Sequence, residues 1–274
     1  MKTLLVLAAL AVGAVLTGAT VLYTGFYDVA ATRQHLASTY ALVETGMRES
    51  VKRHARGIAV PPLDEPALRE RGLAHYGEHC ARCHGAPGVA PEAFALGMVP
   101  APANLAHTAR VWTAAELYWT VKYGIKMTGM PAWEYQLSDD EIWAIVAFLR
   151  AMPGLSPEAY KALAARAQHA KPQTTPPSAS VAPDAARGKA AIAQYACLTC
   201  HSVPGIVGRD APVGPPLEGI GTREYIAGVL PNTPENMVRW LRVPQEVNPR
   251  SAMPDLGVSE RDARDMAAYL YTLK

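Results

Sequence analysis

The sequence contains few charged residues and no long run of charge of either sign. Of the 274 residues, 18% are Asp, Glu, Lys or Arg, and the formal net charge at pH 7 is +2. No basic stripe of the kind that follows a phosphate backbone is present, so a nucleic-acid-binding protein is excluded. Half of the residues are hydrophobic, which is ordinary for a folded protein and excludes disorder throughout the chain.

Cysteine is also scarce, and its positions exclude a disulfide-stabilised fold. The chain has four cysteines, and none lies outside two pentapeptides of the form Cys-x-x-Cys-His. The first pentapeptide contains Cys80, Cys83 and His84, and the second contains Cys197, Cys200 and His201. A structural zinc site needs a further pair of Cys or His ligands, and neither motif has such a pair nearby in the sequence. The motifs therefore favour a chemistry other than zinc binding or thiol redox exchange.

No charged residue occurs between Thr3 and Tyr27. Roughly 20 positions of this segment are apolar or small, which is the number that an α-helix needs to cross a bilayer. A cleaved signal peptide is the alternative, but its apolar stretch would be shorter, and the candidate cleavage site at Val29–Ala31 lies beyond the apolar run. We therefore predict a retained membrane anchor over residues 1–27.

Residues 28–63 form a juxtamembrane segment. The spacing of apolar residues predicts a helix from Tyr40 to His54, with positions 42, 43, 47 and 51 along one side. Basic residues lie among these positions, which predicts either a solvated face near lipid headgroups or a docking helix for a partner subunit. The prolines between Val60 and Leu63 end the segment.

Two similar domains follow, at residues 64–170 and 184–274, and a Pro/Ser/Thr-rich linker at 171–183 joins them. Each domain begins with a helix that leads into its Cys-x-x-Cys-His motif. This helix contains a glycine in each case, Gly72 or Gly188, which indicates that another helix crosses closely at that point.

Each domain ends with a strongly periodic helix. Its N-terminus is marked by a serine with an acidic residue three positions later, Ser138 with Glu141 and Ser259 with Asp262. The apolar faces of the two helices comprise Ile142, Ile145, Val146 and Leu149, and Met266, Ala267, Leu270 and Leu273. The alternation typical of strands is absent, so we predict an all-α fold class with an N-terminal transmembrane helix followed by two domains.

The Cys-x-x-Cys-His motif has the residues that covalent haem attachment requires. Two thiols add across the vinyl groups of the porphyrin, and the histidine that follows binds the iron. Two such motifs beyond an export segment predict two covalently bound haem c groups. Because haem is attached outside the cytoplasm, we expect a single-pass protein of the inner membrane with its haem domains in the periplasm.

We expect a methionine to be the second axial ligand of each haem iron. In the second domain, His201 is the one histidine, and Met237 and Met266 fit helical patterns typical of a core. Met253 lies in a loop before the last helix and is followed by a proline that restricts it. We therefore predict that His201 and Met253 bind the second iron.

In the first domain, Met130 occupies the place that matches Met253. It is also followed by proline and precedes the last helix, whereas Met127, about one turn earlier, remains the competing ligand. The histidines at positions 75, 79 and 107 are expected to be structural or exposed. We therefore predict that His84 and Met130 bind the first iron.

At these residues the chain resembles the class I cytochrome c family. The resemblance is carried by both Cys-x-x-Cys-His motifs, Met130–Trp133, Met253–Pro254 and the Gly-Pro-Pro-Leu sequence at 214–217. It implies that the carbonyl of Pro215 accepts a hydrogen bond from His201, which fixes the ring tautomer. The first domain departs from the family pattern here, and Pro102 is the expected counterpart.

Tyr27–Ala31 and Tyr225–Trp240 are similar to segments in membrane-anchored cytochrome c subunits or partners of haem–copper terminal oxidases. This resemblance implies a dihaem protein that carries electrons from an upstream donor in a respiratory chain to a terminal oxidase, and that is not itself an enzyme. Histidine and methionine fill both axial sites, which leaves no open position for bond-making chemistry. The alternatives are a cytochrome subunit of a periplasmic quinoprotein or flavoprotein dehydrogenase, and a dihaem peroxidase.

Overall fold

The computed structural model describes residues 1–167, 182–208 and 213–274. These residues fall into two compact units, of which the first spans Met1–Thr120, Ile125–Pro131 and Ile145–His169. The second spans Val121–Gly124, Ala132–Ala144 and Ala170–Lys274. The predicted linker at 171–183 lies outside the described residues, apart from its last two positions.

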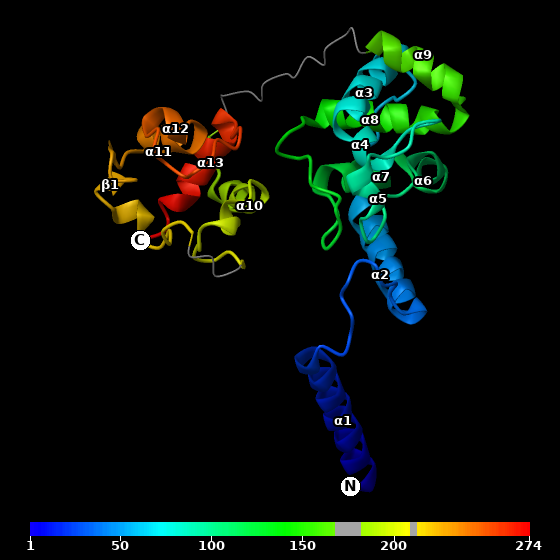
Figure 1. Ribbon diagram of the computed structural model, residues 1–274, viewed down its shortest axis with the longest axis horizontal. Coiled ribbons are helices and arrows are strands. Elements are labelled where there is room, and N and C mark those ends of the chain that lie inside the picture. The colour runs from blue at the N-terminus through cyan, green and yellow to red at the C-terminus, as the bar shows by residue number, and fades with distance from the viewer. Residues whose placement is uncertain (168–181, 209–212) are drawn as a thin grey trace. The chain divides into compact units, whose positions relative to one another are not determined.

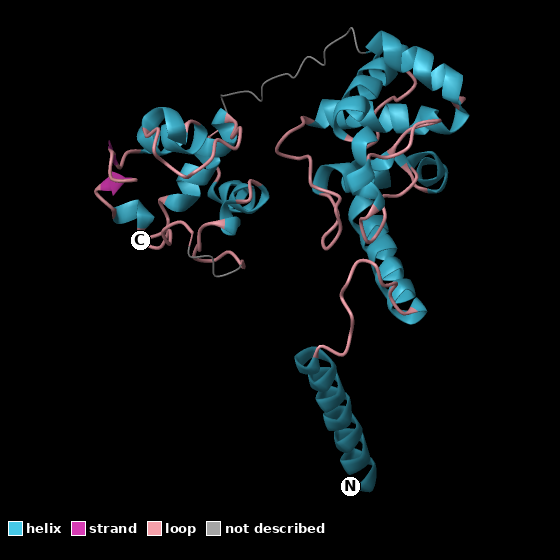
Figure 2. Cartoon of the chain, viewed as in Figure 1, coloured by secondary structure: helices cyan, strands magenta, loops and turns pink. Residues whose placement is uncertain are grey.

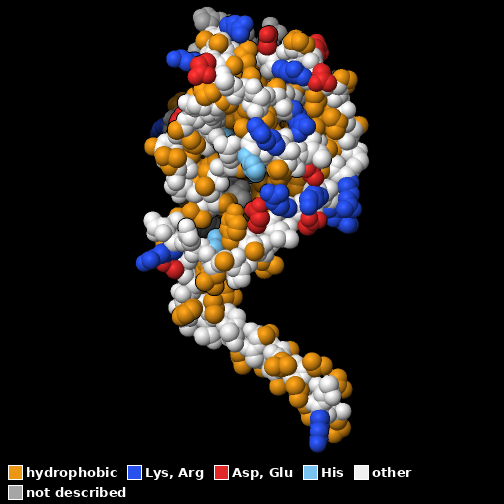
Figure 3. Space-filling model, turned by 90° about the vertical axis from the view of Figure 1, so that its right-hand side faces the viewer, with side chains coloured by type: hydrophobic (Ala, Val, Ile, Leu, Met, Phe, Trp, Pro, Cys, Tyr) orange, Lys and Arg blue, Asp and Glu red, His pale blue; other side chains and the backbone are white. Residues whose placement is uncertain are grey.

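The N-terminal helix α1 spans Lys2–Thr24 and ends at Gly25, which has a left-handed conformation. Its 23 residues give a length of about 34 Å, slightly more than the hydrocarbon core of a bilayer. None of its residues is buried against the rest of the chain, and hydrophobic side chains cover it (Figure 3). Length and composition thus make α1 the one candidate membrane span among the described residues.

Helix α2 spans Ala37–Ala55, slightly longer than the helix predicted from the sequence (Figure 1). Its C-terminal half packs on the first unit: Val51 and Ala55 are buried, and the His54 ring stacks on Trp119 with centroids 5.5 Å apart. The side chains of Leu42 and Val43 are exposed. The predicted apolar stripe is therefore covered by this chain at one end only.

The helices that follow α2 are short and are joined by irregular loops (Figure 2). They are α3 (Pro66–His79), α4 (Ala81–His84), α5 (Ala93–Leu96), α6 (Leu105–Val111), α7 (Ala114–Tyr123), α8 (Asp139–Ala151), the 3-10 helix η1 (Met152–Gly154) and α9 (Pro157–Ala167). The division between the units passes through α7 and α8.

Helix α8 is buried along most of its length. Its predicted apolar face is confirmed, since Ile142, Ile145, Val146 and Leu149 are all buried. Its predicted N-cap is confirmed too. The Ser138 N–H donates to Oε2 of Glu141 at 2.7 Å, and the Glu141 N–H donates to Oγ of Ser138 at 3.3 Å.

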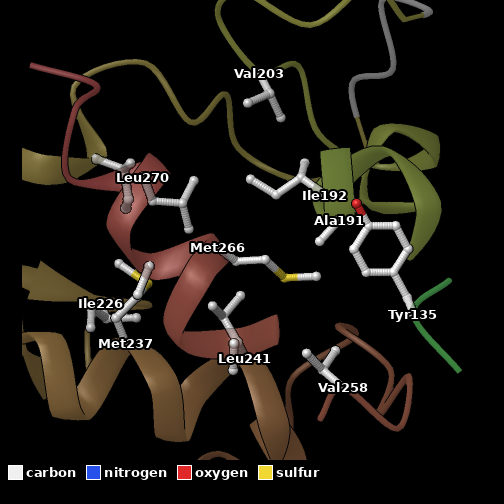
Figure 4. Packing of buried hydrophobic residues seen from close by; sticks show 13 residues of the cluster. Tyr135, Ala191, Ile192, Val203, Ile226, Met237, Leu241, Val258, Met266 and Leu270 are labelled. Atoms are coloured by element: carbon white, nitrogen blue, oxygen red, sulfur yellow. The ribbon is translucent and has the colours of Figure 1, made fainter. Parts of the chain in front are cut away.

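The C-terminal part of the chain is likewise mostly helical. Its elements are α10 (Ala185–Gln194), η2 (Cys197–Thr199), η3 (Ile220–Thr222), β1 (Tyr225–Ile226), β2 (Leu230–Pro231), α11 (Pro234–Arg242), α12 (Pro244–Val247) and α13 (Glu260–Leu270). Met266 of α13 lies at the centre of its core, among Ile192 of α10 and Leu241 of α11 (Figure 4).

Strands β1 and β2 form a small antiparallel hairpin that the sequence did not lead us to expect. Ala227 and Gly228 turn the chain between them, and both have positive φ, 50° and 72°. Two central residues with positive φ are typical of a tight hairpin turn, but alanine is an unusual choice for the first. The hairpin was missed because its strands have two residues each and its turn lacks the usual Asn or Asp.

Helices α10 and α13 cross in close contact at Gly188, as the glycine predicts. A Cβ at this position would lie 1.9 Å from the carbonyl oxygen of Asp265, so no larger residue fits. The contact joins the helix that leads into the second motif to the last helix of the chain, and thereby fixes where the second motif begins.

Candidate haem sites

The first Cys-x-x-Cys-His motif lies at the end of α3. The helix ends at His79, and Cys80 is the N-cap of the single turn α4, so that both thiols and His84 lie within about one turn. The hydroxyl of Tyr76 donates a hydrogen bond to the carbonyl oxygen of Gly85, directly after the histidine, at 2.5 Å. This bond ties the end of the motif back to the buried face of α3.

The imidazole of His84 is held by a backbone carbonyl. Its Nδ1 lies 2.8 Å from the carbonyl oxygen of Ala103. A carbonyl oxygen only accepts hydrogen bonds, so the proton is on Nδ1 and the lone pair on Nε2 is available to a metal. Burial lowers the pKa of His84, and the hydrogen bond to Ala103 opposes this effect. The neutral ring that a metal requires is therefore favoured.

The expectation that Pro102 supplies this carbonyl is wrong, since Ala103 supplies it. The Pro-Ala-Pro-Ala sequence at 100–103 offers several carbonyls in succession, and a backbone acceptor leaves no side-chain signature. Only the path of the loop decides which carbonyl meets the ring.

In the second motif the histidine is also held by a backbone carbonyl, but the motif lies on a 3-10 turn instead of an α-helical turn. Cys197 begins the 3-10 turn η2, and Nδ1 of His201 lies 2.8 Å from the carbonyl oxygen of Pro215, the residue named from the sequence. Gly214 lies against the ring, because a Cβ there would be 2.5 Å from Cε1 of His201. The N–H of Gly214 also donates to the carbonyl of Cys200 at 2.8 Å, which draws this loop over the histidine.

No disulfide bond joins the four cysteines. Burial raises the pKa of Cys80 to about 12 and that of Cys197 to about 11. Thiols of redox-exchange and zinc sites have lowered pKa values instead. In the part of the chain that the structure describes, no cluster of three His, Cys, Asp or Glu side chains is able to hold a metal ion. Cys80 and Cys197 therefore lack the lowered pKa that is typical of redox-exchange and zinc sites.

The candidate methionine ligands lie in the loops before α8 and α13. Helix α13 is the last helix of the chain, but α9 follows α8, so the expectation that α8 ends the first domain is wrong. Met130 and Met253 are both half-buried, and Met253 packs against the second core. Met127, the competitor of Met130, is 99% exposed as a residue and adopts a φ of 58°. Its side chain therefore points to solvent, whereas that of Met130 is partly covered.

The histidines outside the motifs occupy the kinds of place expected for them. His75 is buried on α3 and stacks on His79 at 6.0 Å between ring centroids. His107 lies exposed on α6, and its backbone N–H donates to Oδ1 of Asn104, which caps that helix.

Two tyrosines near the motifs carry roles that the sequence did not reveal. Besides Tyr76, Tyr269 of α13 donates its hydroxyl proton to the carbonyl of Pro204, three residues after the second histidine, at 2.6 Å. An aromatic residue in an amphipathic helix is predicted to lie in the core. The sequence pattern does not indicate that its hydroxyl bonds to a loop.

Comparison with known proteins places each domain in a family. Residues 67–149 match the family described as cytochrome c oxidase, cbb3-type, subunit III, and residues 185–274 match the family described as cytochrome c. One similar protein is cytochrome c oxidase subunit 2 of Alkalihalophilus pseudofirmus, 36% identical over 89 residues, which are 32% of this chain and 25% of that protein. Cytochrome c oxidase subunit 2 of Bacillus sp. strain PS3 is 35% identical over 88 residues, 31% of this chain and 25% of its own length. The match thus covers about a quarter of the length of these curated relatives.

Proposed function

Because this chain is a class I cytochrome c with two cytochrome c domains, related to oxidase subunits, we propose that it passes electrons along a respiratory chain to a haem–copper terminal oxidase. Cytochrome c domains transfer electrons, and the chain's two motifs fit two haem c groups. The upstream donor and the oxidase are the proposed partners, and the chain itself is the carrier rather than the catalyst.

The first haem c would be held by Cys80 and Cys83 through thioether bonds, and its iron by His84 and Met130. The second would be held by Cys197 and Cys200, and its iron by His201 and Met253. A bound haem c supplies an iron that takes up and releases one electron, and histidine with methionine ligation raises its potential.

The observation that carries this proposal is the hydrogen bond from each motif histidine to a backbone carbonyl, to Ala103 in one domain and to Pro215 in the other. Each bond orients the ring, holds the proton on Nδ1 and makes Nε2 a stronger donor. The histidine is oriented in the same way in both motifs, although the first motif lies on an α-helical turn and the second on a 3-10 turn. This recurrence supports an iron site in each domain.

The proposal of an oxidase as acceptor is supported by the comparisons. The first domain matches a family named for an oxidase subunit, and the similar proteins are also named as oxidase subunits. A soluble shuttle would have no need of α1, whereas a tethered domain searches only the membrane surface for its partner. We place the chain in the inner membrane with both haem domains in the periplasm.

The test is gentle extraction of the full chain from its membrane, with analysis of the proteins, metals and spectra that accompany it. Copper and a haem that binds carbon monoxide support the oxidase. Copurification with a quinoprotein or flavoprotein instead makes the chain the electron acceptor of a dehydrogenase. A native haem of this chain that binds peroxide readily would contradict electron carriage and point to a peroxidase.

A further inference from the structure

The two proposed methionine ligands are preceded by a hydroxyl residue at the same position. The sequences are Thr128-Gly-Met130-Pro in the first domain and Ser251-Ala-Met253-Pro in the second. In both, the methionine N–H donates to the side-chain oxygen two residues earlier, Met130 to Thr128 Oγ1 at 3.1 Å and Met253 to Ser251 Oγ at 3.1 Å. The bond recurs although the two domains differ in most other residues.

These hydroxyl residues are themselves tied to the chain upstream of the methionine. Thr128 Oγ1 donates to the carbonyl of Ile125 at 2.7 Å, and the Ile125 N–H donates to the carbonyl of Met130 at 3.2 Å. In the second domain the Ser251 N–H donates to the carbonyl of Asn248 at 2.9 Å. In each domain the methionine is therefore bonded to a residue that is itself hydrogen-bonded three residues further back. The bonds of this second step differ between the domains, but the hydroxyl residue occupies the same position before the methionine.

The residue after each methionine restricts it from the other side. Proline has a fixed φ, offers no N–H, and favours an extended conformation in the residue before it. The methionine thus has its N–H bonded to the hydroxyl and its carbonyl side limited by proline. Both backbone angles of the methionine are restrained, so the direction of its Cα–Cβ bond is set before the thioether meets an iron.

We propose that Thr128 and Ser251 are positioning residues for the axial methionines, and that their hydroxyls keep each thioether in place by accepting the methionine N–H. This rests on the proposed function, because it takes Met130 and Met253 as the ligands. The residue between the hydroxyl residue and the methionine differs between the domains. It is Ala252 in the second domain and Gly129 in the first, where a Cβ would lie 3.0 Å from Sδ of Met98.

The test uses the full haem-loaded chain with Thr128→Val or Ser251→Ala, each of which removes the accepting oxygen. Ser251→Ala removes one hydrogen bond, whereas Thr128→Val also removes the bond to the carbonyl of Ile125. Loss of one hydrogen bond, about 1 kcal/mol, should let imidazole displace Met253 from the ferric iron about five-fold more readily, and Met130 in Thr128→Val at least as readily, each in its own domain alone. Thr128→Ser and Ser251→Thr keep the oxygen and should restore the native affinity for imidazole. The resolved methyl resonances of the axial methionines in the reduced protein report each site separately.

Thr113→Val and Thr233→Val are the matched controls. Their hydroxyls also accept backbone N–H groups, but from Glu116 and Asn236 at the starts of helices α7 and α11 rather than from a methionine. They should lower the stability of their domain and leave the affinity for imidazole unchanged. Equal affinities in Thr128→Val, Ser251→Ala and the native protein would overturn the positioning role.

Failure of the ligand assignment gives a different result. Met130→Ala and Met253→Ala should each abolish one methionine methyl resonance and the methionine-to-iron absorption of that haem. If these features persist in either variant, that methionine is not the ligand, whatever the hydroxyl variants show. If they vanish while the hydroxyl variants behave as the native protein does, the ligands stand and the positioning role falls.

Discussion

At the scale of single residues, each proposed haem site depends on backbone atoms as much as on side chains. His84 and His201 are both oriented by a carbonyl oxygen at 2.8 Å, although one carbonyl belongs to Ala103 and the other to Pro215. Any residue could supply that oxygen. What the site requires is a loop whose path brings one carbonyl to Nδ1, and in the second domain Gly214 permits that path.

Replacement of Gly214 by alanine should displace the imidazole of His201. The new Cβ would lie 2.5 Å from Cε1 and 2.7 Å from Nδ1, so ring or loop must move. We expect the free energy of unfolding of the second domain to fall by about 1–3 kcal/mol, measured by denaturation of the haem-loaded chain.

Gly208→Ala is the control for this variant. Its Cβ would lie 3.4 Å from the side chain of Leu198, an ordinary contact, and we expect a change within about 0.5 kcal/mol. Equal effects of the two replacements would show that Gly214 has no special relation to the histidine.

At the scale of elements, the second domain is held together where α10 meets α13. The crossing at Gly188 brings the backbones together, and beside it Arg187 forms ion pairs with Asp262 and Asp265 of α13. Both carboxylates are buried and are satisfied by further donors, Asp262 by the hydroxyl of Tyr195 and Asp265 by the N–H of Asp184. The helix before the motif is thus joined to the last helix by packing and by charge.

Gly188→Ala should lower the free energy of unfolding of the second domain by about 3 kcal/mol or more, since the added methyl group would overlap the backbone of Asp265. Gly77→Ala in α3 is the control. Nothing lies within 4 Å of the position of its Cβ, so the better helix former should stabilise by about 0.5–1 kcal/mol. Native stability of Gly188→Ala in chemical denaturation would contradict the crossing described here.

Asp262→Ala should cost about 3 kcal/mol of unfolding free energy, because it leaves Arg187 with one of its two partners and removes an acceptor from Tyr195. Glu260→Ala tests whether any acidic residue of α13 has this effect. Glu260 pairs with Arg264 and Arg242 at the surface, where the loss should stay below about 1 kcal/mol. Comparable losses in thermal or chemical unfolding would mean that burial of the pair contributes little.

At the scale of the whole molecule, one apolar helix precedes two cytochrome c domains. Helix α1 is long enough to cross a bilayer, and the exposed apolar residues at the start of α2 follow it closely in the sequence. An anchored chain confines both domains to the membrane surface, which raises their effective concentration at a membrane-bound partner.

Replacement of residues 1–27 by a cleavable export signal should release the haem-loaded chain into the soluble periplasmic fraction with unchanged haem spectra. The native chain should stay with the membrane after an alkaline wash, because about 20 apolar residues hold it there. Fractionation followed by haem staining distinguishes the two. An intact mass showing that the natural protein lacks the residues before Ala31 would mean that the segment is a signal and not an anchor.

The sequence by itself determined the helical class, the apolar N-terminal helix, the capped helices that follow Ser138 and Ser259, and the two Cys-x-x-Cys-His motifs. These features are local, because a cap, an amphipathic period or a Cys-x-x-Cys-His spacing is set by residues within a few turns of one another. The close crossing at Gly188 could also be predicted, because glycine weakens a helix and its presence there suggests that a larger side chain would not fit.

The tertiary structure alone decided which carbonyl meets each histidine, that Tyr76 and Tyr269 fasten the loops after the motifs, and that Ala227 turns a short hairpin. Each of these depends on the path of a loop between elements distant in sequence, and a backbone carbonyl or a tyrosine hydroxyl has no pattern of its own. Spacing could place the methionines in matching loops. It could not show that Thr128 and Ser251 hold them by the same bond, because that bond exists only once the loop has folded.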